Sequence, residues 1–279
     1  MARLALTDLR RGTVILSSDP AQPAVPVLPE MPGSAAGEPY GVACLADGRL
    51  IFADRAASRV VCMAEDGSGF ASFGTLGSGE GELRLPSGVA VGADGRIYVA
   101  DTGNCRIVAV DSMAADGWQT YGSKGGPTAS DPGIGRFSQP VALAADAGGV
   151  VVVDAGAARV VRLTTLSDAG WDASAPGQLR APVAVALLPD GTIVVADLAA
   201  RRLALLTTPS AGVVAGIVDD LLPGPTAVVA VTNDRLAVCA APAGALLSVE
   251  RIGGVWSVTL DRWLGPLGLH RPAAMCLLP

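Results

Sequence analysis

The chain has 279 residues, of which 50% are hydrophobic, and its mean hydropathy is +0.45. Its net charge of −6, with Lys124 as the single lysine, argues against a nucleic-acid partner. No apolar run reaches the ~18 residues that a membrane-spanning helix needs, so no membrane span is expected.

Short apolar stretches separated by glycine, proline and Asp-Gly pairs run along the whole chain and predict β-strands. In chain order, the first two are residues 3–7 and 13–16, and a third is expected near residues 24–28. Five similar units follow, at residues 39–83, 86–130, 140–178, 182–222 and 225–268. The remaining stretch, residues 269–279, carries one further strand that begins at Pro272.

Residues 86–110 form the clearest of these units. Strands are predicted at residues 88–91, 97–100 and 107–110, with Asp94-Gly95 as a two-residue hairpin turn between the first two. A similar sequence pattern recurs along the chain, and a regular repeat of about 20–50 residues is typical of solenoids and propellers.

The spacing within the units predicts how the chain closes. Each of the five units begins at a proline, and in four of them an aspartate ends the second strand, while the fifth runs from Pro225 to Ala240. The spacing is 15 residues for Pro39–Asp54, Pro86–Asp101 and Pro182–Asp197, and 14 for Pro140–Asp154. Counted across the junction between the two chain ends, Pro272 and Asp8 are also 15 residues apart. We therefore expect a closed ring of six repeats, cut inside the last one.

Residues 73–110 resemble an NHL repeat, with the glycine-rich segment before Pro86 and the run from Tyr98 through Asp101 to Arg106. The resemblance is good in three more units and weak in residues 225–250. It implies an all-β, six-bladed propeller of four-stranded antiparallel blades, covering residues 1–279 as a single domain. Three strands of the closing blade then come from the N-terminus, and its innermost strand comes from the C-terminus. NHL propellers include lyases, lactonase-like enzymes and non-catalytic interaction modules, so the resemblance does not select a function.

The five cysteines predict a reducing, cytoplasmic location. They show no CxxC pairing, and most of them replace apolar residues in predicted strands, which suits small core side chains: Cys44, Cys62, Cys105, Cys239 and Cys276. If residues 3–7 form a strand of the closing blade, no residues remain for a cleavable signal peptide.

An arginine follows the repeat aspartate by five residues in four units: Asp54/Arg59, Asp101/Arg106, Asp154/Arg159 and Asp197/Arg202. The two positions flank a four-residue loop, so we expect a structural ion pair that holds this loop. The fifth unit has alanine at both places, Ala240 and Ala245, as expected if the two residues serve each other.

Antiparallel alternation places the loops before the prolines at one mouth of the channel, opposite the Asp-Gly turns. Any ligand or partner site is expected at this mouth, and the candidate binding residues are Glu38, Tyr40, Arg84, Ser87, Gln139, Arg180, Trp263, His270 and Arg271. Three arginines at equivalent positions could hold a carboxylate or a phosphate of a small anionic ligand. The alternative is that they are solvated loop residues whose aliphatic stems cover apolar surface.

Metal, cofactor and catalytic motifs are weak. Glu38 resembles the glutamate that holds a divalent cation in lactonase-like propellers, but the other ligands of such a cage are missing, so no metal and no cofactor are expected. His270 is the only histidine, which excludes a multi-histidine zinc site. Cys105 is expected in an exposed loop beside Arg106, as a structural or incidental cysteine rather than an activated thiol.

Three tryptophans, Trp118, Trp171 and Trp256, are expected on outer strands, packed between blades or over the outer edge. From these features the sequence favours a non-catalytic binding or scaffolding propeller, whose partner is a protein or a small anionic ligand. The alternative is an enzyme of the lyase, hydrolase or lactonase-like class with its site at the same mouth. Neither the oligomeric state nor the identity of the partner can be predicted.

Overall fold

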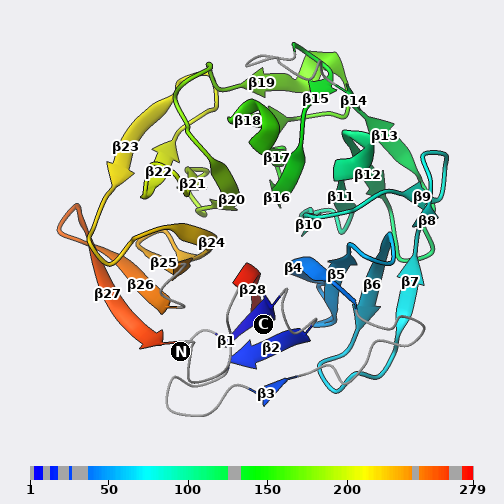
Figure 1. Ribbon diagram of the computed structural model, residues 1–279, viewed down its shortest axis with the longest axis horizontal. Helices are drawn as coiled ribbons and strands as arrows, with labels where there is room; N and C mark the ends of the chain where they lie inside the picture. The colour runs from blue at the N-terminus through cyan, green and yellow to red at the C-terminus, as the bar shows by residue number, and fades with distance from the viewer. Residues whose placement is uncertain are drawn as a thin grey trace.

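The computed structural model describes residues 3–8, 13–17, 25–26, 37–124, 133–240, 245–263 and 272–278. In this part of the chain, six four-stranded antiparallel sheets stand as blades around a central axis (Figure 1). In every blade one edge strand lies at the axis and the other at the circumference (Figure 1). The predicted all-β propeller of four-stranded blades is confirmed.

The blades are numbered in chain order, and their strands are given from the axis outward. Blade 1 consists of β4 (Pro39–Cys44), β5 (Leu50–Asp54), β6 (Arg59–Met63) and β7 (Ala71–Phe73), and blade 2 of β10 (Val89–Val91), β11 (Ile97–Asp101), β12 (Arg106–Val110) and β13 (Gln119–Tyr121). Blade 3 consists of β16 (Pro140–Asp146), β17 (Gly149–Asp154), β18 (Arg159–Leu163) and β19 (Trp171–Ala173), and blade 4 of β20 (Pro182–Leu187), β21 (Ile193–Asp197), β22 (Arg202–Leu206) and β23 (Val213–Ile217). Blade 5 consists of β24 (Pro225–Thr232), β25 (Arg235–Ala240), β26 (Ala245–Ile252) and β27 (Val255–Trp263).

The closing blade joins the two ends of the chain. Its strands are β28 (Pro272–Leu278), β1 (Arg3–Asp8), β2 (Thr13–Ser17) and β3 (Val25–Pro26), in that order from the axis. β28 pairs antiparallel with β1, with Leu4 opposite Leu277 and Ala5 opposite Cys276. The sharing of this blade between the N-terminal and C-terminal segments is therefore confirmed.

The core lies between the blades. Six clusters of buried apolar side chains each span a pair of neighbouring blades, and together they run around the whole ring. Between blades 3 and 4, for example, Val153 and Val160 share a cluster with Val195. The middle strands are covered on both faces, so all five residues of β5 and of β21 are buried. This explains why these strands appear in the sequence as continuous apolar runs rather than as alternating patterns.

The loop between the first and second strands is one residue longer than predicted. In blade 2, the backbone N–H of Gly92 donates to Arg96 O over 2.8 Å, and the N–H of Gly95 donates to Gly92 O over 2.9 Å. Gly95 has a φ of +84°, so the connection is a type I turn followed by a left-handed glycine, not a two-residue hairpin. The Asp94 carboxylate accepts the backbone N–H of Arg96 over 3.1 Å and holds this turn.

Two of the connections between blades contain a short parallel strand pair. β8 (Thr75–Leu76) pairs with β9 (Glu82–Leu83), and β14 (Ser123–Lys124) pairs with β15 (Arg136–Phe137). The helices in the described ranges are the single 3₁₀ turns η1 (Thr102–Asn104), η2 (Ala155–Ala157) and η3 (Asp168–Gly170). Within those ranges, no helix has the length and hydropathy needed to cross a membrane.

Removal of residues 272–279 should abolish ring closure. The deletion takes away β28, which leaves the inner edge of β1 unpaired and uncovers the apolar faces of blades 1 and 5. Unpaired sheet edges associate with other chains, so we expect aggregation or a large fall in melting temperature, measured by light scattering and thermal unfolding. A truncated protein that stays monomeric with an unchanged melting curve would show that this blade does not hold the ring.

Candidate functional site

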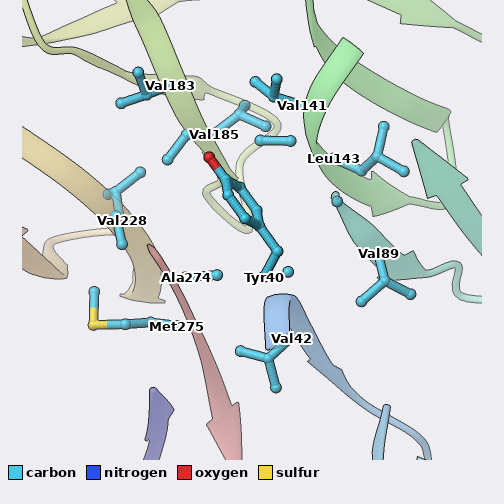
Figure 2. Close-up of a pocket in the computed structure, with 15 residues that line it drawn as sticks. Tyr40, Val42, Val89, Val141, Leu143, Val183, Val185, Val228, Ala274 and Met275 are labelled. Carbon is cyan, nitrogen blue, oxygen red and sulfur yellow. The ribbon is translucent and has the colours of Figure 1, made fainter. Parts of the chain in front are cut away.

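The channel at the axis of the propeller is narrow and apolar. It is lined by the innermost strands of all six blades, and Figure 2 shows valines, Leu143 and Met275 around it. The space that remains is about 50 Å³. That volume suits a few water molecules, since one water needs about 10–15 Å³, whereas pockets for organic ligands have about 300–1,000 Å³. The channel itself is too small for a substrate.

Small residues make the channel narrow. The second residue after the first proline of each blade lines the cavity, and in every blade it is glycine or alanine: Gly41, Gly88, Ala142, Ala184, Ala227 and Ala274. A Cβ atom on Gly41 would lie 2.6 Å from Ser87 O, and one on Gly88 would lie 2.9 Å from the Cα of Ala142. The innermost strands thus approach backbone to backbone. This pattern is visible in the sequence, but the sequence-based prediction did not use it.

Tyr40 projects into this channel. Its ring stands between the surrounding strands, with the hydroxyl directed toward Val183 and Val185 (Figure 2). The guanidinium carbon of Arg55 lies 5.5 Å from the ring centroid, so a cation–π contact holds the ring from the blade 1 side. Among the described lining residues, Tyr40 is the only one with a titratable side chain. The lining therefore offers little acid–base chemistry.

Four of the other predicted mouth residues are not among the described lining residues of the channel. They are exposed and are held by their main chains rather than by their side chains: Glu38, Arg84, Gln139 and Arg180. The backbone N–H of each donates to the repeat aspartate of its blade, over 3.3 Å, 2.7 Å, 2.7 Å and 3.1 Å respectively. Neither Arg84 nor Arg180 is among the described lining residues of the channel. The convergence of three arginines over the channel mouth stays a prediction.

The remaining predicted residues have different surroundings. Ser87 is fully buried, and its hydroxyl accepts a hydrogen bond from Thr102 Oγ1 over 2.8 Å. Trp263 ends β27, opposite Ala245 in the register of blade 5. His270 and Arg271 lie outside the described residues, so their part in a site stays a prediction.

The repeat aspartates are the centres of a clamp that recurs in blades 1 to 4. All four carboxylates are completely buried, and each is paired with the arginine five residues later, over 3.1, 2.8, 3.4 and 3.4 Å: Asp54/Arg59, Asp101/Arg106, Asp154/Arg159 and Asp197/Arg202. The predicted ion pairs are confirmed. Burial raises the pKa of Asp154 above its ordinary value, and hydrogen bonds from Gln139 N–H and from Arg159 oppose this rise.

The clamp does more than the sequence predicted, because it also holds the segment between the blades. Asp101 accepts the backbone N–H of Arg84 over 2.7 Å as well as Arg106 Nε over 2.8 Å. The same guanidinium donates to the carbonyl oxygens of Ser78 and Glu82, over 2.7 and 2.8 Å. One aspartate–arginine pair thus ties the loop between the second and third strands to the connector before the first.

Blade 5 replaces the clamp by apolar contact. Ala240 pairs with Ala245 in the register where Asp101 pairs with Arg106, and both alanines are buried. Loss of both partners leaves no buried charge behind, which is the arrangement that avoids the largest penalty.

Cys105 is not the exposed loop residue that was predicted. Its side chain is 6% exposed, its φ is +55°, and its thiol donates to Ser138 O over 3.4 Å. Cys105 is the last residue of the loop between the second and third strands of blade 2. Ser58, Ala158 and Arg201 take the same left-handed conformation at this place in blades 1, 3 and 4. Burial also raises the pKa of the Cys239 and Cys276 thiols. These three cysteines are core residues.

The tryptophans pack between blades, as predicted. Trp118 of blade 2 meets Phe73 of blade 1 edge to face, with ring centroids 6.4 Å apart. Trp171 of blade 3 lies 6.1 Å from Tyr121 of blade 2, and Arg159 stacks over its indole ring at 5.0 Å.

In the part of the chain that the structure describes, no three His, Cys, Asp or Glu side chains gather in a way that could hold a metal ion. A metal that binds only the folded state would stabilise it, and its removal would lower the melting temperature. Since we expect no bound metal, chelation with EDTA should leave the melting temperature unchanged. A fall in melting temperature that calcium restores would contradict this and would place a metal at Glu38 or in the segments outside the described residues.

Comparisons with known proteins agree with this architecture. A family model described as NHL repeat matches residues 83–109, which carry β10, β11 and most of β12. The chain is thus a β-propeller with an NHL repeat in blade 2, and the predicted resemblance is confirmed. No curated protein matches the sequence significantly.

Solved structures with the same fold have diverse roles. A nidogen/laminin complex contains a chain that is 14% identical, with a TM-score of 0.75 and coverage of 100% of this chain and 99% of that one. Virginiamycin B lyase from Staphylococcus aureus is 13% identical, with a TM-score of 0.66 and coverage of 92% and 80%. A protein of unknown function from Bacteroides caccae is 16% identical, with a TM-score of 0.68 and coverage of 100% and 99%. At these identities the likeness shows the fold alone.

Removing both members of the clamp should destabilise the protein by less than the sum of removing each one alone. Asp101→Ala leaves the Arg106 guanidinium without its carboxylate, and breaking one side of a buried pair costs about 3–5 kcal/mol, which lowers the melting temperature by on the order of 10 °C. The double variant Asp101→Ala/Arg106→Ala copies Ala240 and Ala245, so we expect it to be less destabilised than the sum of the two single variants. The check is a double-mutant cycle from chemical denaturation, with the exposed Asp94→Ala as control; strict additivity would contradict the clamp.

Proposed function

We propose that this propeller is a non-catalytic binding module, and that its partner surface is the face that carries the connectors between blades. This connector face comprises the segments before the first proline of each blade and the loops between the second and third strands. The observation that carries the proposal is where the exposed large apolar side chains lie. Of the eleven among the described residues, six stand in these segments: Leu76, Leu85, Ile134, Leu198, Val218 and Leu221.

Two of these side chains, Leu85 and Leu198, stand next to the first proline or the repeat aspartate of their blades. Leu85 directly precedes Pro86, is 44% exposed and has a φ of +48°, a conformation that is unfavourable for a bulky residue. Leu198 follows the buried Asp197 and is 37% exposed. The exposed Arg84 directly precedes Leu85. The backbone N–H of Leu198 donates over 2.9 Å to the carbonyl of Ala181, the residue after the exposed Arg180. Leucine and arginine presented together on a rigid framework suit a protein partner, because apolar contact supplies affinity and charge supplies specificity.

The interior of the propeller supports binding rather than catalysis. The channel holds only about 50 Å³ and has an apolar lining. The buried carboxylates Asp54, Asp101, Asp154 and Asp197 are occupied by backbone N–H groups and by arginines. A propeller chain in the nidogen/laminin complex shares the fold across the whole length of this chain, and there the fold serves a complex between proteins.

The enzyme alternative rests on likeness to a lyase fold and on His270, which is outside the described residues. Among the described residues, no group of acid, base and nucleophile faces the channel, so we do not propose a reaction. The cytoplasmic location expected from the cysteines stays a prediction.

The proposal is tested by paired surface variants in affinity capture with cross-linking and mass spectrometry. Leu85→Asp/Leu198→Asp places charges on the connector face, and Val255→Asp, at a residue 70% exposed beside the β26–β27 turn on the opposite face, is the matched control. We expect a partner that is captured by the wild type and the control and lost by the double variant, with all three proteins equally folded. Loss in Val255→Asp with retention in the double variant would assign the partner to the opposite face and refute the proposal.

A further inference from the structure

The clamp arginine of blade 4 differs from its counterparts in how far the connector covers it. The side chains of Arg59, Arg106 and Arg159 are 14%, 12% and 3% exposed, whereas that of Arg202 is 26% exposed. Arg106 donates to the connector carbonyls of Ser78, Gly79 and Glu82, and Arg159 donates to those of Gly133 and Arg136. Among the described residues, the one connector carbonyl that accepts from Arg202 is Gln178 O, over 2.6 Å.

The length of the connector explains this. Residues 74–85, twelve in number, lead from β7 to Pro86 and fold back over Arg106. Residues 174–181, only eight, lead from β19 to Pro182. The shorter segment places one carbonyl, that of Gln178, within hydrogen-bond distance of Arg202.

An open cavity of about 500 Å³ lies beside the shorter connector. Its lining consists of Gly177, Gln178, Arg180, Ala200, Arg202 and Val218. The cavity has none of the channel-lining residues, and its volume lies in the range of small-molecule pockets. It contains two guanidinium groups, and no carboxylate is among its described lining residues.

The donors of Arg202 are incompletely used. A guanidinium has five N–H donors, but the hydrogen bonds of Arg202 to Gln178 O and to Asp197 Oδ2, over 2.6 and 3.4 Å, both come from Nη2. Its Nε is buried and has no partner among the described residues. In blades 1 to 3 the same nitrogen donates to the repeat aspartate. A buried donor without an acceptor is unfavourable, and an incoming acceptor that draws the guanidinium into better geometry would relieve this.

Arg180 supplies the second charge at a fixed place. Its backbone N–H donates to both carboxylate oxygens of Asp197, over 3.1 and 3.2 Å, while its side chain is exposed. Asp197 thus holds the main chain of one arginine and the guanidinium of the other. Exposed Val218, at 72%, and Ala200 provide apolar surface on the same cavity.

We propose that this cavity binds a small molecule through an oxyanion, a carboxylate or a phosphate, held between Arg180 and Arg202. Arginine pairs recognise these planar or tetrahedral oxygen groups by charge-assisted, often bidentate, hydrogen bonds. The apolar part of the ligand lies over Ala200 and Val218. This inference goes beyond the connector-face role, because it needs no protein partner and can fail without affecting it.

The test titrates the purified protein with inorganic phosphate and, separately, with acetate, at constant ionic strength set with sodium chloride. Binding is followed by calorimetry and by the NMR signals of the arginine Nε–H groups. We expect saturable binding of at least one anion and a shift of the Arg202 Nε–H signal. Saturation by phosphate alone identifies a phosphate ligand, and saturation by acetate alone identifies a carboxylate.

Arg180→Gln removes one charge at an exposed residue and should weaken binding about tenfold with unchanged thermal stability. Arg251→Gln, near the β26–β27 turn on the opposite face, is the control and should bind like the wild type. Arg202→Lys keeps the charge but loses the fork of donors, so it should also weaken binding. The proposal is overturned if neither anion saturates, or if Arg251→Gln weakens binding as much as Arg180→Gln.

Discussion

The structure depends on a buried carboxylate that is shared between two parts of the chain. In blades 1 to 4 the aspartate at the end of the second strand accepts backbone N–H groups from the connector and is paired with an arginine on the third strand. A connector at the rim would otherwise leave its N–H groups without partners, and unpaired backbone groups are unfavourable when buried. The aspartate accepts these N–H groups and, through its arginine, also holds the loop between the second and third strands. The arginine neutralises the negative charge of the buried carboxylate.

The same interaction sets the direction in which each blade meets the next. Once the connector is held, the first proline of the following strand starts at a fixed height, and glycine or alanine two residues later allows the innermost strands to approach closely. The consequence is a channel of only about 50 Å³. Because the axis is filled by backbone and by Tyr40, the proposed binding surface lies farther out, at the connectors, where loop length and composition vary from blade to blade.

Variation among the blades is therefore more informative than their similarity. Blade 2 encloses its arginine with a long connector, blade 4 leaves Arg202 partly uncovered beside an open cavity, and blade 5 dispenses with the ion pair. Blade 5 keeps its place because Val238 and Leu247 share an apolar cluster with Val194 of blade 4. Burial between blades can thus hold a blade without a clamp, and the clamp can carry an additional role where its donors are not used up.

The sequence by itself determined the architecture. The spacing from proline to aspartate and the shared arginine predicted the blades, the ion pairs and the closing blade, because each of these follows from local register and from a repeat that is visible in one dimension. The sequence-based prediction was wrong at Cys105, which is buried, and at the Asp94-Gly95 turn, whose loop is one residue longer. Which mouth residues share a cavity was decided only by the tertiary structure. Arg180 meets Arg202 there rather than Arg84, since the side chains of a propeller rim are directed by the length and path of the connectors, and no periodicity encodes these.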